Sequence, residues 1–130
     1  MTELPTLARE LLDGNNFASV ATVQPDGSPQ SSIVWVKRDG NDVLFSTIHG
    51  RRKTANLAAN PRVSVLVTDA GDPYRYAEIR GEAQLTEDPA AALIDELAVK
   101  YTGEPFNAPP GQQRVIVRIR PAHVVAYDDE

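Results

Sequence analysis

Arg51, Arg52 and Lys53 are three consecutive cations at the predicted start of a short helix, residues 51–60. A helix N-terminus already carries about half a positive charge, so cations placed there repel the helix dipole and one another. A phosphate would relieve this repulsion by accepting hydrogen bonds from backbone N–H groups and cationic side chains together. Thr47, at the end of the preceding strand, could add a hydroxyl. The run therefore predicts an anion site, and the alternative is a solvated basic patch paired with surface acids.

Aromatic residues mark two further segments. Trp35 is the one tryptophan of the chain and lies in a predicted strand, where a core position is a more common role than a ligand contact. Tyr74, Arg75 and Tyr76 form the other group, just after a predicted loop. Two aromatic rings flanking a cation can stack on a planar ligand, and they can equally pack at a surface or an interface. The sequence leaves both interpretations of this group open.

The sequence contains no set of residues typical of catalysis by side chains alone. It has no cysteine, which excludes thiolate nucleophiles and cysteine-built metal sites. Its two histidines, His49 and His123, leave little for a histidine metal site, and no serine stands next to either of them. Motifs of phosphate-binding loops, dinucleotide-binding turns, zinc proteases and serine hydrolases are missing. We therefore expect no metal site and no catalytic side-chain nucleophile.

Length and composition indicate a single small domain over residues 1–130. Hydrophobic residues make up 42% and charged residues 24%, a globular composition. The net charge of −5, without a broad basic stripe, argues against nucleic acid as a partner. No apolar run approaches the roughly 20 residues of a membrane span, and the N-terminal segment lacks a signal-type apolar stretch. We expect a cytoplasmic protein with no membrane partner.

The cations and aromatic residues must be positioned mainly by strands. Seven segments alternate apolar and polar residues with period two, and turn signals such as Asp39-Gly40 separate them. Apolar residues at helical spacing mark the helices, the last of which opens with Asp88 and Pro89. The predicted strands are 16–24, 30–38, 43–47, 62–68, 74–85, 114–120 and 122–127, and the predicted helices are 4–12, 51–60 and 89–101. The fold class is mainly β: six or seven antiparallel strands, the first three a meander, closed into a barrel with two or three short flanking helices.

Five stretches of the chain occur in an order and spacing typical of one superfamily. They are Asn16–Val23, Asp26–Gln30, Arg51–Leu57 with Asn60-Pro61-Arg62, Tyr76-Ala77 with Arg80–Ala83, and Pro121–Val124. With these, the sequence resembles the split β-barrel flavin and deazaflavin oxidoreductases, the superfamily that includes pyridoxamine-phosphate-oxidase-like proteins. The resemblance extends from Leu11 to Tyr127. It is nearest to the actinobacterial branch that binds the deazaflavin coenzyme F420.

The resemblance implies a split barrel of the type that binds flavin mononucleotide (FMN), and a homodimer with two cofactor sites at the subunit interface. The cofactor phosphate would contact the helix-start residues, and the ring system would lie along residues 30–36. Tyr74 and Tyr76 would come from the other subunit or line the substrate pocket, where either could donate a proton; no catalytic residue is assigned. The implied cofactor-binding residues are Gln30, Ser32, Ile33, Val34, Trp35, Thr47, Arg51, Arg52, Lys53, Asn56 and Tyr76.

The second strand favours one cofactor. FMN enzymes of the superfamily often carry an arginine ahead of the ring-binding stretch, whereas this strand has none between Gln30 and Val36. The resemblance therefore favours coenzyme F420, whose polyglutamate tail a basic groove of Lys37, Arg38 and Arg52 could attract, with FMN as the alternative. The implied activity is hydride transfer between the deazaflavin and an unsaturated or quinone-like small molecule. An FMN-dependent pyridoxamine-phosphate-oxidase-like enzyme or flavin reductase, and a non-catalytic cofactor- or haem-binding barrel, are the alternatives.

Overall fold

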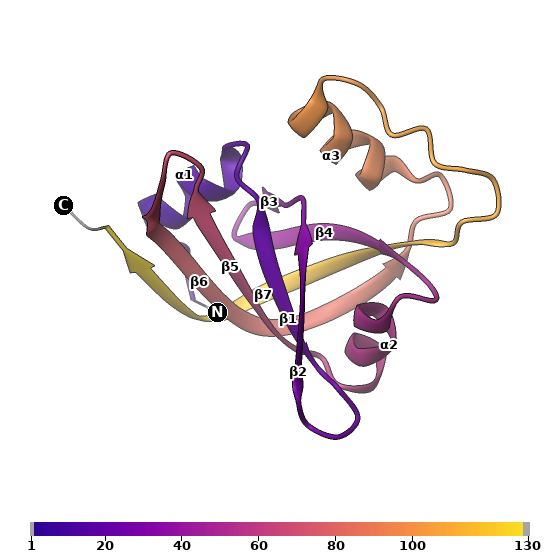
Figure 1. The fold of residues 1–130 in the computed structure, drawn as a ribbon, viewed down its shortest axis with the longest axis horizontal. Coiled ribbons are helices and arrows are strands. Elements are labelled where there is room, and N and C mark those ends of the chain that lie inside the picture. Colours follow the sequence, from indigo (N-terminus) through magenta and orange to yellow (C-terminus); the bar gives the residue numbers. More distant parts are fainter. Residues whose placement is uncertain (1, 129–130) are drawn as a thin grey trace.

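The computed structural model describes residues 2–128, so residues 1, 129 and 130 of the predicted domain lie outside the described part. One curled antiparallel sheet is surrounded by three short helices (Figure 1). The helices are α1 (Thr6–Asp13), α2 (Arg52–Ala59) and α3 (Ala92–Thr102). The strands are β1 (Ala18–Val23), β2 (Pro29–Val34), β3 (Lys37–Asp39), β4 (Asp42–Ile48), β5 (Arg62–Asp69), β6 (Asp72–Glu87) and β7 (Arg114–Tyr127). None of these helices is long and apolar enough to cross a membrane.

Strand order explains how the sheet closes. The strands lie in the order β2-β1-β5-β6-β7-β4-β3, and each neighbouring pair is antiparallel. The two edge strands, β2 and β3, are consecutive in the chain and are separated by Trp35 and Val36. The chain therefore crosses from one edge of the sheet to the other within two residues, and the sheet curls into a split barrel. This confirms the predicted mainly β split barrel with flanking helices.

The crossing corrects the predicted strand over residues 30–38. Its first part, β2, pairs with β1, whereas its last part, β3, pairs with β4 at the opposite edge. The predicted three-stranded meander is therefore wrong, and the chain opens instead with two separate hairpins. Alternation of buried and more exposed residues continues through Trp35 and Val36, so the sequence pattern carries no sign of the break.

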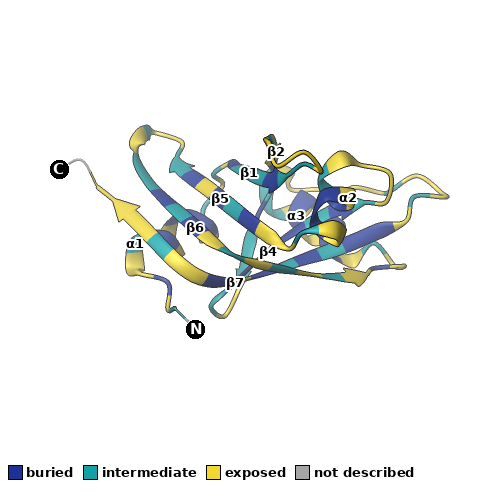
Figure 2. Ribbon diagram, turned by 90° about the horizontal axis from the view of Figure 1, so that it is seen from below, coloured by how far each residue is buried: buried dark blue, intermediate teal, exposed yellow. Residues whose placement is uncertain are grey.

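The barrel interior is filled by aliphatic side chains from alternate strand positions. Val20, Val65 and Ile79 come from three neighbouring strands, and each is fully buried. Leu11 and Leu12 of α1 pack against the same core. Each such side chain stabilises the fold by roughly 1.5–3 kcal/mol through removal of apolar surface from water. Figure 2 shows the core and the change of β7 from a buried to an exposed strand along its length.

β7 runs unbroken from Arg114 to Tyr127, although the sequence predicts two strands separated by Pro121. Proline lacks a backbone N–H, and the register between β6 and β7 shifts beside it, between Arg80 and Gly81. Gly81 lies opposite Pro121, and a Cβ atom on this glycine would come within 2.0 Å of the Arg120 carbonyl oxygen. The irregular pairing accommodates the proline inside one strand, and it requires glycine at position 81.

The helices α1 and α3 begin two and three residues later than predicted. The Asp88 carboxylate accepts hydrogen bonds from the N–H groups of Ala92 (3.2 Å) and Leu93 (3.0 Å), so it caps α3. The helix nevertheless begins at Ala92 rather than at Pro89, because Ala91 has a left-handed backbone conformation with a φ of 55° and occupies the N-cap position. Similarly, α1 begins at Thr6 rather than at residue 4.

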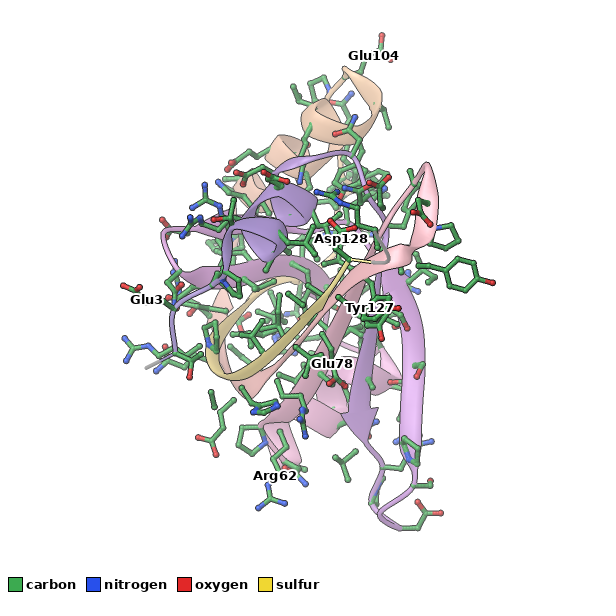
Figure 3. All side chains as sticks on the ribbon, turned by 90° about the vertical axis from the view of Figure 1, so that its left-hand side faces the viewer. Glu3, Arg62, Glu78, Glu104, Tyr127 and Asp128 are labelled. Carbon is green, nitrogen blue, oxygen red and sulfur yellow. The ribbon has the colours of Figure 1, made fainter. Side chains whose placement is uncertain are left out.

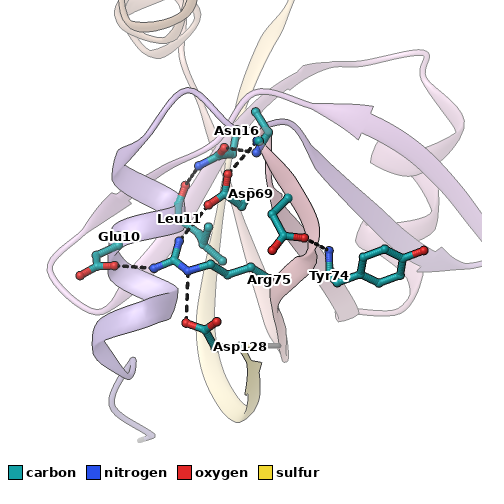
Figure 4. Close-up of polar contacts among 10 residues, drawn as sticks. Glu10, Leu11, Asn16, Asp69, Tyr74, Arg75 and Asp128 are labelled. Carbon is teal, nitrogen blue, oxygen red and sulfur yellow. Dashed lines mark hydrogen bonds and ion pairs between the residues drawn. The ribbon is translucent and has the colours of Figure 1, made fainter. Parts of the chain in front are cut away.

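Arg75 joins three parts of the chain near one end of the barrel (Figure 4). Its guanidinium contacts Glu10 of α1 at 2.9 Å, Asp69 at the end of β5 at 3.0 Å, and Asp128 after β7 at 3.3 Å. Hydrogen bonds to these carboxylates raise the pKa of Arg75 above its ordinary value. Three carboxylates already occupy this side chain, so the interpretation of Arg75 as a cation between two ligand-stacking tyrosines is corrected.

Gly81→Ala should destabilise the protein by more than about 2 kcal/mol, because the added methyl group meets the Arg120 carbonyl inside the β6–β7 ladder. Urea denaturation followed by circular dichroism measures the change in unfolding free energy. Gly71→Ala is the matched control: its Cβ atom would lie 3.4 Å from an Asp69 side-chain oxygen, and the expected change is about 0.5 kcal/mol or less. Equal stability of the two variants would contradict the close approach at position 81.

Candidate functional site

A cavity of about 240 Å³ lies among β2, β4, the start of α2, α3 and the start of β7. It brings together predicted site residues that are far apart in the chain: Ile33, Val34, Trp35, Thr47, Arg51 and Lys53. The other lining residues were not singled out from the sequence: Phe17, Ser46, Ile48, Ile94, Leu97 and Arg114. The cavity therefore combines an apolar wall with a cationic one.

The cationic wall consists of Arg51, Lys53 and Arg114, called here the cation cluster. β4 ends at Ile48, Gly50 turns the chain with a φ of 97°, and Arg51 then occupies the N-cap position of α2. Arg114 comes from the far end of the sequence as the first residue of β7, paired with Ile48 in the β4–β7 ladder. Antiparallel pairing thus places a third cation beside the two that precede or open the helix.

The members of the cation cluster form no ion pair with any residue between 2 and 128. Arg114 is nearly buried, with 9% of its surface exposed. Its guanidinium donates a hydrogen bond to Gln112 at 3.1 Å and lies over the Phe106 ring at 4.9 Å. These contacts hold the guanidinium in place without neutralising its charge.

The pKa values of the cluster reflect this lack of compensation. Burial lowers the pKa of Lys53, and the charge of Arg51 lowers it further. Burial also lowers the pKa of Arg114, again with a contribution from Arg51, while nearby aspartates act in the opposite direction. In a chain of net charge −5, the cluster is a local excess of positive charge. Guanidinium and ammonium groups in this arrangement fit a phosphate, which would accept their hydrogen bonds and cancel the repulsion.

The apolar wall is formed by Ile33, Val34 and Trp35, with side chains of α3 above them. The Trp35 ring stacks on that of Tyr101 with centroids 5.5 Å apart and an interplanar angle of 14°. Trp35 is only partly buried and lines the cavity, which corrects its interpretation as a core residue. Phe17 and Ile33 are 59% and 66% exposed, so the wall continues as an open apolar surface where a planar ring can lie.

Thr47 lines the cavity, and its hydroxyl already has a partner. It lies 3.0 Å from the Thr54 hydroxyl, which in turn donates a hydrogen bond to the Ile48 carbonyl at 2.6 Å. These bonds tie the end of β4 to the first turn of α2. The neighbouring Ser46 hydroxyl is buried without a hydrogen-bond partner in the described chain.

Gln30 and Asn56 lie away from the lining of this cavity, where α2 contacts the β1–β2 hairpin. The Thr22 hydroxyl donates to the Gln30 side-chain oxygen at 2.7 Å and accepts a hydrogen bond from the Asn56 side-chain amide at 3.0 Å. Asn56 is 2% exposed. These three side chains join α2 to the β1–β2 hairpin, so the structure assigns Asn56 to this polar contact rather than to the cavity.

Arg52, Ser32 and Tyr76 also lie outside the cavity lining. Arg52 is on the exposed side of α2, beside the turn that connects β1 to β2. The Ser32 hydroxyl is buried and has no partner in the described chain. Tyr76 stacks on Tyr127 of β7 with ring centroids 5.4 Å apart, and Tyr74 is 69% exposed at the start of β6. Within one chain, neither tyrosine reaches the cavity.

The predicted basic groove of Lys37, Arg38 and Arg52 does not form. Lys37 forms an ion pair with Glu96 of α3. Both guanidinium nitrogens Nε and Nη2 of Arg38 donate hydrogen bonds of 2.9 Å to the Asp13 carboxylate. The first two cations are therefore compensated, and Arg52 lies beside a different turn. These charge partners lie 25 and 59 residues away along the chain and cannot be read from a local run of cations.

Arg114 is the functional residue that the sequence reasoning missed. It follows the proline-rich loop and opens a predicted strand, where it resembles any exposed strand end. The signal that could have found it is the pairing of residues 43–48 with residues 114–119, because this register brings position 114 to the helix start.

The pattern of the pyridoxamine 5'-phosphate oxidase family matches residues 4–128. The chain therefore belongs to that family, as the resemblance implied. A pyridoxine/pyridoxamine 5'-phosphate oxidase of Rubrobacter xylanophilus is 35% identical over 74 residues, which are 56% of this chain and 34% of that protein. One from Cupriavidus taiwanensis is 44% identical over 52 residues, 39% of this chain and 24% of that protein. The matches thus span about a third or less of these two enzymes.

Solved structures share the fold over nearly the whole chain. An F420 reductase has a TM-score of 0.85 and 35% sequence identity, with 94% of this chain and 98% of that chain covered. A conserved hypothetical protein of Mycobacterium tuberculosis has a TM-score of 0.76 and 22% identity, with 98% and 90% covered, and shows the fold alone.

Lys53→Met should raise the unfolding free energy of the ligand-free protein by up to about 1 kcal/mol after allowance for solvent screening. The methionine keeps the apolar stem and removes a cation that Arg51 and burial disfavour. Urea denaturation at low salt measures the gain, which should shrink as salt screens the cluster. Arg52→Met, at an exposed position outside the cluster, should change stability by about 0.5 kcal/mol or less. A loss of stability in Lys53→Met would show that the cluster is already compensated.

Proposed function

We propose that the protein is an oxidoreductase that binds coenzyme F420 in this cavity and reduces an unsaturated or quinone-like small molecule. The observation that carries the proposal is the juxtaposition of an unpaired cation cluster with an open apolar wall. A phosphate-bearing cofactor with a planar ring needs both surfaces side by side. Membership of the pyridoxamine 5'-phosphate oxidase family supports a flavin or deazaflavin oxidoreductase.

The residues of the chain divide into two binding tasks. Arg51, Lys53 and Arg114 would hold the cofactor phosphate, through charge-assisted hydrogen bonds that are stronger than neutral ones. Ile33, Val34 and Trp35 would support the ring and keep water away from one face. When bound, the deazaflavin supplies hydride transfer, which is why the site needs no side-chain nucleophile or metal. The protein contributes position and desolvation.

Two observations favour F420 over FMN. The F420 reductase structure is similar to this chain over almost the full length of both proteins, at 35% identity. In addition, no cation from β2 lines the cavity, so the phosphate would rest on the cation cluster alone. FMN remains the second candidate function, supported by the two pyridoxine/pyridoxamine 5'-phosphate oxidases among the relatives.

We also propose that the active form is a homodimer, as the resemblance implied. The outer face of β5, β6 and β7 carries exposed apolar side chains, among them Leu66 (40% exposed), Val125 (40%) and Tyr127 (48%). Figure 3 looks towards Tyr127 and Glu78, which lie on this face. Leu66, Glu78 and Val125 lie in one row across the three strands. Exposed apolar side chains gathered on one sheet face, here on either side of Glu78, are typical of a protein interface, and Tyr74 and Tyr76 lie next to them.

Lys53→Met should weaken F420 binding by roughly 10- to 150-fold, because one charge-assisted hydrogen bond to the phosphate is lost. Quenching of Trp35, the lone tryptophan, measures the affinity directly. Arg52→Met serves as the comparison, since this neighbouring cation lies outside the cavity and its loss should change the affinity less than about twofold. Equal losses in both variants would place the phosphate elsewhere. If the unmodified protein bound FMN more strongly than F420, FMN would be the cofactor and the F420 proposal would be wrong.

Val125→Glu should convert the proposed homodimer to monomers at micromolar concentration, since it places a charge opposite Glu78 in the apolar face. Analytical ultracentrifugation measures the mass in solution. Val99→Glu is the control, because Val99 is 50% exposed on α3 and lies outside this face. A monomeric unmodified protein, or a dimer that survives Val125→Glu, would rule out this interface.

A further inference from the structure

The crossing residues Trp35 and Val36 belong to neither edge strand, so their backbone groups lack ladder partners. Val36 is fully buried, and a buried backbone N–H or C=O group without a partner is costly. The C-terminal turn of α3 supplies both partners. The Val36 N–H donates to the Tyr101 hydroxyl at 3.2 Å, and the Val36 carbonyl accepts from Lys100 Nζ at 2.6 Å.

The same two α3 side chains also bind the last turn of α1 and the segment that connects it to β1. The Tyr101 hydroxyl donates to the Asn16 carbonyl at 2.7 Å, and Lys100 Nζ donates to the Leu12 carbonyl at 2.5 Å. Three separate parts of the chain therefore meet at the end of one helix. Lys100 and Tyr101 are each only partly exposed, and together they join the crossing to the rest of the barrel.

This junction adjoins the apolar wall of the cavity. The Tyr101 ring lies between Trp35, stacked at 5.5 Å, and Phe17, tilted at 5.8 Å. Lys100 Nζ lies 4.9 Å from the centroid of the Tyr101 ring. Trp35 and Phe17 both line the cavity, and neither Lys100 nor Tyr101 does. The two α3 residues can thus act on a ligand only through the wall that they support.

We propose that Lys100 and Tyr101 are positioning residues that hold the Trp35–Val36 crossing, and through it set the orientation of the ring-supporting wall. The role in cofactor binding rests on the proposed function, whereas the control of Trp35 orientation does not. The physical reason is that the crossing has no strand neighbours, so its geometry is set by the side chains of α3. Replacement of Lys100 or Tyr101 should make the Trp35 side chain more mobile while the core of the barrel remains packed.

The protonation state of Lys100 should affect the environment of Trp35 in the apolar wall. Burial lowers the pKa of Lys100 to about 8, with Lys37 of β3 acting in the same direction and Asp13 of α1 opposing it. Asp13 pairs with Arg38, Lys37 pairs with Glu96, and the Tyr101 ring is the remaining group that faces Lys100. Below this pH the ammonium donates charge-assisted bonds to two carbonyls, and above it the neutral amine donates weaker ones.

The test uses the intrinsic fluorescence of Trp35 in the full, ligand-free chain. Between pH 6.5 and 9.5 the emission of the unmodified protein should change with a midpoint near 8. Lys100→Met should abolish this change, and Lys100→Arg should also abolish it because the guanidinium stays charged throughout. Thermal unfolding of each variant establishes that it is folded. A constant emission in the unmodified protein, or the same transition in Lys100→Met, would overturn the proposal.

Tyr101→Phe tests the hydroxyl separately from the stacked ring. It removes the hydrogen bonds of the hydroxyl to Val36 and Asn16. Trp35 should become about twice as accessible to acrylamide, and F420 or FMN binding should weaken about fivefold. Thr102→Val is the matched control, because its hydroxyl bonds locally to the Ala98 and Glu104 carbonyls and not to the crossing. Unchanged acrylamide quenching in Tyr101→Phe would overturn the positioning role. If quenching changes but neither cofactor binds the unmodified protein, the proposed function fails and the positioning role stands.

Discussion

The structure depends on the two residues, Trp35 and Val36, that carry the chain from one edge of the sheet to the other. A sheet can close into a barrel at this point only if the crossing backbone finds hydrogen-bond partners outside the strand ladders. The end of α3 provides them through Tyr101 and Lys100. Trp35 also lines the cavity. The crossing segment therefore both closes the barrel and forms part of the apolar wall.

The opposite wall of the cavity carries the positive charge of the cation cluster. Elsewhere in the described chain, many cations are matched: Lys37 by Glu96, Arg38 by Asp13, and Arg75 by three carboxylates. The cation cluster has no such partner. We propose that a negatively charged ligand compensates this positive charge, which is a local excess in an acidic chain.

Family membership and cavity geometry both fit a protein that binds and orients a cofactor, with the reactive group supplied by the cofactor. The chain belongs to the pyridoxamine 5'-phosphate oxidase family, and its cavity offers groups that bind and orient rather than groups that attack. Such a protein needs a rigid scaffold more than a reactive side chain. The barrel core, the Gly81–Pro121 contact and the Arg75 contacts all serve that rigidity, and the proposed homodimer would extend it across a second chain.

The sequence by itself determined the local features: the period-two strands, the cations at a helix start, the Asp88 cap and the lack of catalytic side chains. These depend on near neighbours, and the structure confirms the helices and most of the strands. The Asp88 carboxylate accepts hydrogen bonds at the start of α3, although Ala91 occupies the N-cap position. The tertiary structure alone decided that Arg114 joins Lys53, that Asn56 turns into the barrel, and that Lys37 and Arg38 are neutralised. It also decided that the strand over residues 30–38 breaks at Trp35. The physical reason is the same in each case. The closed barrel sets the strand register and the charge pairs between distant segments, and the local residue pattern does not encode either of them.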